Sequence, residues 1–156
     1  MTLDGWAFGA APKTPSVTGN PGNGAIIYSY APAGSDDFSE TVPTQPGTYA
    51  VKASVAETAN YQGGEASGEF AIEPLAVKEV ALTGGTVTAQ VACGLSDASV
   101  YCAAYDDSGL MLALSVKPVS GADAYEFQFD GASVAYAKAF LLDANLRPLC
   151  EMKRSS

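Results

Sequence analysis

The first half of the chain is interrupted every few residues by proline or glycine. The prolines are Pro12, Pro15, Pro21, Pro32, Pro43 and Pro46, with Gly19, Gly22, Gly24, Gly34 and Gly47 between them. Proline removes a backbone hydrogen-bond donor, and both residue types mark turns and loops. The segment is also poor in helix formers, so this spacing predicts short strands joined by turns.

Three segments of the first half alternate as strands do, namely 25–30, 47–55 and 66–72. Alternate side chains of a strand share a face. The shared faces carry Ile26, Tyr28 and Tyr30, then Tyr49, Val51, Ala53 and Val55, then Phe70 and Ile72. The middle strand has an apolar side and a mostly polar side, which predicts a half-buried strand. Pro43 and Pro46 are expected to act as edge and turn residues before it, and Tyr61 to pack back near its far end.

The second half has longer alternating segments and only two prolines in its interior, Pro118 and Pro148. We expect strands at 86–91, 99–105, 110–116, 125–129 and 135–143, with Asp130-Gly131 ending the fourth. The sequence DDSG between the second and third predicts a β-hairpin, with Gly109 supplying a positive φ. Leu110, Leu112, Leu114 and Val116 share one face of this hairpin. A helix is the alternative for 135–143, but the preceding hairpin spacing favours a strand.

Glu73-Pro74-Leu75 breaks the alternation, which places a domain boundary at about 73–79. Eight acidic residues against two basic ones give residues 1–74 a charge of −6, and nine against six give 75–156 a charge of −3, which sum to the −9 of the whole chain. We therefore predict an all-β fold, with two small immunoglobulin-like or fibronectin-like β-sandwich domains in tandem at 1–74 and 75–156.

The net charge of −9 argues against nucleic acid and anionic lipid as partners, because both are polyanions. No apolar segment approaches the roughly 20 residues that span a bilayer. The N-terminus has neither the basic nor the apolar region of a signal peptide. Because Met1 is followed directly by a β-like segment, we expect the chain to be a piece of a longer protein.

The sequence contains no histidine, which removes the commonest general base and the commonest metal ligand. A serine or cysteine nucleophile paired with histidine is therefore excluded. The three cysteines, Cys93, Cys102 and Cys150, are expected to be free and buried. A disulfide joining Cys93 to Cys102, or Cys102 to Cys150, is the alternative.

Two acidic pairs, Asp36-Asp37 and Asp106-Asp107, stand beside glycine and serine. Asp and Ser favour turns, so we interpret both pairs as turn residues; calcium binding is the alternative. The aromatic residues are expected to fill two small cores, with sugar stacking on an exposed face as the alternative. They are Trp6, Tyr28, Tyr30, Tyr49, Tyr61, Tyr101, Tyr105, Tyr125 and Tyr136. We predict no catalytic, cofactor-binding or metal-binding residue and no cofactor.

The first half resembles the bacterial immunoglobulin-like repeat found in tandem on secreted and surface proteins of Gram-positive bacteria. The resemblance covers about residues 3–73. The matching residues are Trp6-Ala7-Phe8-Gly9, Pro15, Tyr28-Ser29-Tyr30, the segment PTQPGTYAVKA at 43–53, and Asn60-Tyr61.

The second half is similar to small β-sandwich modules of secreted Firmicutes proteins, over about 80–150. The matching residues are the segments GTVTA at 85–89, AAYDDSGL at 103–110 and AKAFLLD at 137–143, with Arg147-Pro148-Leu149. Both resemblances imply modules without catalytic residues that accompany catalytic, adhesive or anchoring domains.

These observations predict a non-catalytic spacer or interaction module of a larger bacterial secreted or cell-surface protein, located outside the cell. The alternative is a module that binds carbohydrate or peptide in adhesion. The expected partners are neighbouring domains of a longer chain and a host or cell-wall glycan or protein. An enzyme fragment is the least favoured hypothesis.

Overall fold

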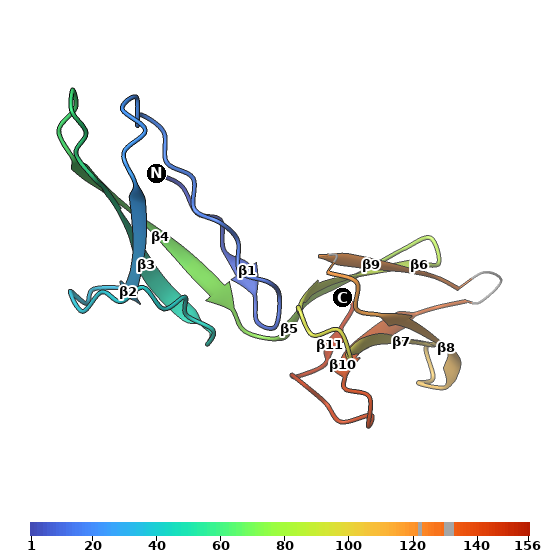
Figure 1. The fold of residues 1–156 in the computed structure, drawn as a ribbon. Coiled ribbons are helices and arrows are strands. Elements are labelled where there is room, and N and C mark those ends of the chain that lie inside the picture. The colour runs from blue at the N-terminus through green and yellow to red at the C-terminus, as the bar shows by residue number, and fades with distance from the viewer. Residues whose placement is uncertain (122, 130–132) are drawn as a thin grey trace. The chain divides into compact units, whose positions relative to one another are not determined.

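The computed structural model describes residues 1–121, 123–129 and 133–156, and these residues form eleven strands and no helix (Figure 1). The predicted all-β class is confirmed. The chain divides into two compact units. Unit 1 comprises Met1–Ala7 and Ala11–Glu73, and unit 2 comprises Phe8–Ala10 and Pro74–Ser156. That these units correspond to two independently folding domains, divided at residue 74, stays a prediction.

Unit 1 contains one four-stranded sheet in the order β1-β4-β3-β2. Its strands are β1 (Trp6–Ala7), β2 (Ile26–Pro32), β3 (Gly47–Val55) and β4 (Gly64–Glu73). The pairs β2–β3 and β3–β4 are antiparallel, whereas β1 lies parallel to β4 with Trp6 opposite Ile72. The three longer strands contain or overlap the three predicted segments, because their alternation is regular and glycine or proline marks their ends.

Phe70 of β4 is the centre of the buried aromatic cluster of unit 1. Its ring stacks on Trp6 at 5.0 Å between centroids and on Tyr49 at 5.7 Å, and it meets Tyr30 edge-on at 6.1 Å. Val51, Ala53 and Ile72 extend the same core. The predicted buried faces of β3 and β4 are therefore confirmed.

Unit 1, all of whose residues are described, differs from the predicted sandwich in having a single sheet. The segments 11–25 and 33–46 form only isolated bridges, Thr2 to Ser16 and Tyr30 to Ser39, and single backbone hydrogen bonds such as those from Ala56 to Ala25 and from Ala33 to Thr48. Five of the six early prolines lie in these two segments. Each lacks a backbone donor, so the segments do not continue as ladders of a second sheet.

Unit 2 is a sandwich of two sheets around one core, as predicted. One sheet has the order β5-β6-β9 and the other β11-β10-β7-β8. Their strands are β5 (Ala76–Thr83), β6 (Thr86–Ala92), β7 (Ser99–Tyr105), β8 (Met111–Pro118), β9 (Ala124–Gln128), β10 (Tyr136–Leu142) and β11 (Lys153–Arg154). The core includes Val87, Val100, Cys102, Phe127 and Leu141.

No strand was predicted where β5 lies. This strand begins inside the predicted boundary region at 73–79 and pairs with β6. Thr83 lies opposite Thr86, so Gly84 and Gly85 form a two-residue hairpin turn. Both glycines have positive φ, 59° and 84°, which a turn of this tight kind requires of its central residues. The same dipeptide that ends β5 therefore also fixes its register with β6.

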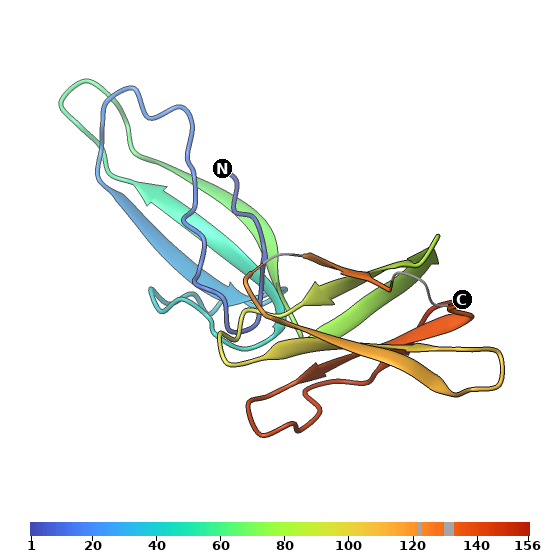
Figure 2. The same ribbon diagram turned by 90° about the vertical axis from the view of Figure 1, so that its right-hand side faces the viewer.

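The predicted hairpin at 99–116 is confirmed by the antiparallel pairing of β7 with β8 (Figure 2). Gly109 has a φ of 86° in its turn. β10 is a strand and not a helix, as the hairpin spacing favoured, and it pairs with β7 over its whole length. The predicted end of the fourth strand at Asp130-Gly131 lies outside the described residues.

Candidate functional site

The acidic pair Asp106-Asp107 stands in the β7–β8 turn, as the turn interpretation predicted. The Asp106 carboxylate accepts hydrogen bonds from the Ser108 N–H at 2.9 Å, the Ser108 hydroxyl at 2.7 Å and the Leu110 N–H at 2.9 Å. These donors favour the charged form, so the pKa of Asp106 is lowered, with the Ser108 hydroxyl contributing most. The carboxylate is thus engaged in shaping the turn.

Asp36-Asp37 lies between β2 and β3, just after a turn at 33–34, and the Asp37 N–H donates to the Ser35 hydroxyl at 3.1 Å. Among the described residues, no three histidine, cysteine or carboxylate side chains come together as metal ligands. That the chain has no catalytic, cofactor-binding or metal-binding residue stays a prediction.

All three cysteines are free, and Cys93 and Cys102 are buried. Burial raises the pKa of the Cys102 thiol to about 11 and also raises the pKa values of Cys93 and Cys150. Neither of the two alternative disulfides that the sequence left open is formed. The core environment keeps Cys102 a neutral thiol, which makes it a packing residue and a poor nucleophile.

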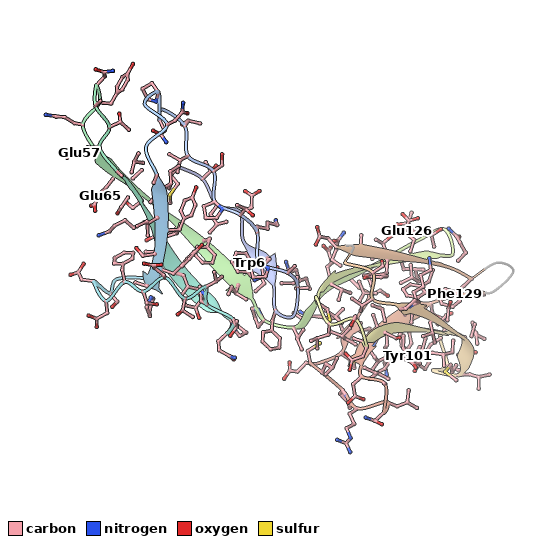
Figure 3. All side chains as sticks on the ribbon, in the orientation of Figure 1. Trp6, Glu57, Glu65, Tyr101, Glu126 and Phe129 are labelled. Carbon is pink, nitrogen blue, oxygen red and sulfur yellow. The ribbon has the colours of Figure 1, made fainter. Side chains whose placement is uncertain are left out.

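Six of the nine aromatic residues that the sequence singled out fall into two groups. Trp6, Tyr30 and Tyr125 are buried, as core residues should be. Three other tyrosines, Tyr101, Tyr105 and Tyr136, are only half-buried, and register places them together on one face of β7 and β10. Figure 3 shows Tyr101 on this part of unit 2. The sequence interpretation that the tyrosines fill the cores is therefore right for only some of them.

A cleft of about 310 Å³ lies in unit 1 between the segment 17–24 and the residues that join β3 to β4. Thr18, Thr58, Tyr61, Gln62 and Glu65 contribute polar groups to it. No lysine or arginine lines it. Glu57 and Glu65 mark this end of the sheet in Figure 3. The lining therefore suits an uncharged polar ligand better than an anionic one.

The cleft depends on two glycines that let its walls approach closely. A Cβ added at Gly22 would lie 2.8 Å from both the Thr58 hydroxyl and the Tyr61 ring, and one at Gly24 would meet the Ala56 carbonyl oxygen. The Asn20 side chain bonds both backbone groups of Gly24, at 2.8 and 3.0 Å. Tyr61 lies against Gly22 and remains 50% exposed, so the expected packing at the end of β3 leaves half of this side chain accessible.

Comparison with known proteins gives one family. Residues 5–76 match the model of the MBG domain. This match covers nearly the same residues as the predicted resemblance to an immunoglobulin-like repeat and confirms it at the level of a β-domain type. The restriction to Gram-positive bacteria and the resemblance of residues 80–150 stay predictions. The comparison with curated proteins gave no significant match.

Because the described residues form no helix, none of them belongs to a helix that could span a membrane.

Proposed function

We propose that this chain is a non-catalytic structural module of a larger bacterial secreted or cell-surface protein, where it separates neighbouring domains. The match of residues 5–76 to the MBG domain carries the proposal. The second unit, a sandwich around a hydrophobic core, serves as the following module of the same series. The expected partners are the adjoining domains of the longer chain.

The connection between β4 and β5, one of the places where the chain passes from one unit to the other, supports a spacer that resists bending. β4 ends at Glu73 and β5 begins at Ala76, so only Pro74 and Leu75 separate the two strands. Proline fixes its own φ and holds the preceding residue extended. A connection this short and stiff restricts rotation far more than a flexible linker would.

We expect small-angle scattering of the whole chain to give a narrow distribution of distances between the two units. The matched control inserts six glycine and serine residues between Glu73 and Pro74, which should broaden that distribution and raise the radius of gyration. Equal distributions for the two chains would contradict the proposed spacer, because the natural connection would then be as flexible as the insert.

The cleft of unit 1 favours a second candidate function, the binding of an uncharged glycan. Tyr61 offers an exposed ring on which a sugar could stack, and Thr58, Gln62 and Glu65 offer hydrogen-bonding groups beside it. Glu65 is held by the Ser54 hydroxyl at 3.1 Å, which fixes one carboxylate oxygen at the rim.

We expect Tyr61→Ala to weaken binding of a neutral cell-wall or host oligosaccharide at least tenfold, and Tyr61→Phe to weaken it much less, because the ring supplies the stacking surface. The measurement is an array of neutral glycans followed by titration calorimetry of any binder. Ile27→Ala, on an equally exposed residue of β2, is the control. An array without a binder, or equal binding by the Tyr61→Ala protein, would exclude the glycan site.

A further inference from the structure

Strand β8 carries a row of large apolar side chains on the surface of unit 2. Leu114 is 53% exposed, and Leu112 and Val116 on the same face are exposed as well. The sequence showed that these residues share a face, and the structure shows that this face is the outer one. Cross-strand register shows which face of β8 is the outer one. Residues opposite each other share a face, and Ser115 lies opposite the buried Cys102, so Ser115 is on the inner face. Leu114 and Val116 alternate with Ser115 and are therefore on the outer face.

The apolar surface continues from β8 across the outer face of the sheet. Val116 lies opposite Tyr101 of β7, and Tyr101 lies opposite Phe140 of β10. Farther along, the rings of Tyr105 and Tyr136 stack at 4.9 Å. A continuous apolar patch of this kind on a soluble domain marks an interaction site more often than chance exposure.

The strands of this sheet carry basic side chains although the chain as a whole is acidic. Arg154 lies 3.8 Å above the Tyr136 ring and Lys138 lies 5.0 Å above the Tyr105 ring, and Lys117 stands at the end of β8. No residue of β7, β8, β10 or β11 is acidic. Charges beyond about 8 Å are screened at physiological salt, so Lys117, which belongs to the edge strand itself, is the cation that an added strand would meet.

β8 is also an open edge. Its sheet has the order β11-β10-β7-β8, so among the described residues the backbone groups of β8 that face away from β7 have no strand partner. Edge strands are usually protected by charge or proline. Lys117 and Pro118 lie at one end of β8 and a register irregularity between Met111 and Ala113 lies at the other, and the six residues Met111–Val116 contain neither a charge nor a proline.

We propose that β8 accepts an extended segment of another polypeptide as a fifth strand, and that this segment alternates apolar and acidic residues. Its backbone would pair with the open edge, and its apolar side chains would pack beside Leu112, Leu114 and Val116. A carboxylate on its other face would lie opposite Lys117, where cross-strand pairs of opposite charge are favourable. This interaction goes beyond the proposed spacer function and does not depend on it.

The test uses the whole chain and a fluorescein-labelled eight-residue peptide in which valine or isoleucine alternates with glutamate or threonine. We expect saturable binding by fluorescence anisotropy at about 0.15 M salt. Leu114→Glu should weaken peptide binding at least tenfold, because the substitution removes an apolar contact and adds a negative charge that repels the glutamates of the peptide. Leu114→Ser should give an intermediate loss. Leu114 is exposed, so circular dichroism should show an unchanged fold for both variants.

Two controls distinguish strand addition from nonspecific binding of the peptide. Ile27→Glu places the same charge on β2, an exposed edge strand of unit 1, and should leave binding within twofold. A peptide with alternate backbone amides methylated keeps its side chains but cannot pair, and should bind at least tenfold more weakly. If the methylated peptide binds as tightly as the unmethylated one, strand addition is wrong. If the Leu114→Glu protein binds the peptide as tightly as the natural chain does, the proposed location on β8 is wrong.

The oligomeric state distinguishes another polypeptide from a second copy of this chain. Two copies each carry a net charge of −9, so we expect a monomer in sedimentation velocity. A dimer that Leu114→Glu abolishes would overturn the proposed occupant and assign the edge to self-association. Failure of the test peptide to bind at millimolar concentration would also overturn the proposal.

Discussion

Replacing Phe127 by alanine is expected to lower the free energy of unfolding of unit 2 by about 3–5 kcal/mol. Phe127 is 1% exposed and is among the largest fully buried side chains described. It projects from β9 into the core that both sheets of unit 2 share. Its removal leaves a cavity that the two sheets cannot close without shifting their pairing. Urea unfolding followed by far-ultraviolet circular dichroism measures the change.

The same variant tests whether the two units fold independently. The chain has a single tryptophan, Trp6, which belongs to unit 1, so its fluorescence reports on that unit alone. If the units are separate domains, Phe127→Ala leaves the fluorescence transition where it was and moves only part of the dichroism transition. A shared shift would contradict the division at residue 74. Glu126→Ala, on the exposed neighbour, is the control and should change stability by no more than about 0.5 kcal/mol.

Several strands that the sequence predicted have one apolar and one polar face. In β9 every second residue is buried, and in β3 Val51 and Ala53 are buried while the residues between the apolar ones are polar or small, so both segments show a period of two. β5 lacks this signal because a bulge between Val77 and Glu79 shifts its register, so that Val77 and Val80 are both buried three residues apart. A rule based on strict alternation cannot detect such a strand.

The candidate interaction surface could not be predicted for a related reason. Alternation shows which residues share a face but not which face is turned inward. In β7 both faces are apolar, with Val100 and Cys102 inside and Tyr101 outside, and in β8 the more apolar face, with Leu114 and Val116, is the outer one. Only the pairing with β10 and the opposite sheet decides between them. The cleft of unit 1 could not be predicted from the sequence either, because its walls come from segments more than thirty residues apart.

Replacing Phe70 by alanine should destabilise unit 1 by about 3–5 kcal/mol. The loss should exceed that expected from area alone, because each aromatic pair contributes roughly 0.5–1.5 kcal/mol beyond burial and Phe70 joins three other rings. Unit 1 has one sheet and no second layer of strands to compensate, so we expect it to be largely unfolded at physiological temperature.

The comparison of Phe70→Ala with Phe70→Leu separates the ring interactions from the burial of apolar volume. Leucine fills most of the space but offers no ring to Trp6 or Tyr49, so we expect it to recover more than half of the lost stability while Trp6 emission still changes in the folded protein. Ile27→Ala, on an exposed residue of the same sheet, should leave both quantities unchanged. If Phe70→Leu were as stable as the natural chain with identical Trp6 emission, the stacked rings would contribute nothing, and the aromatic cluster would not be what holds a single sheet together.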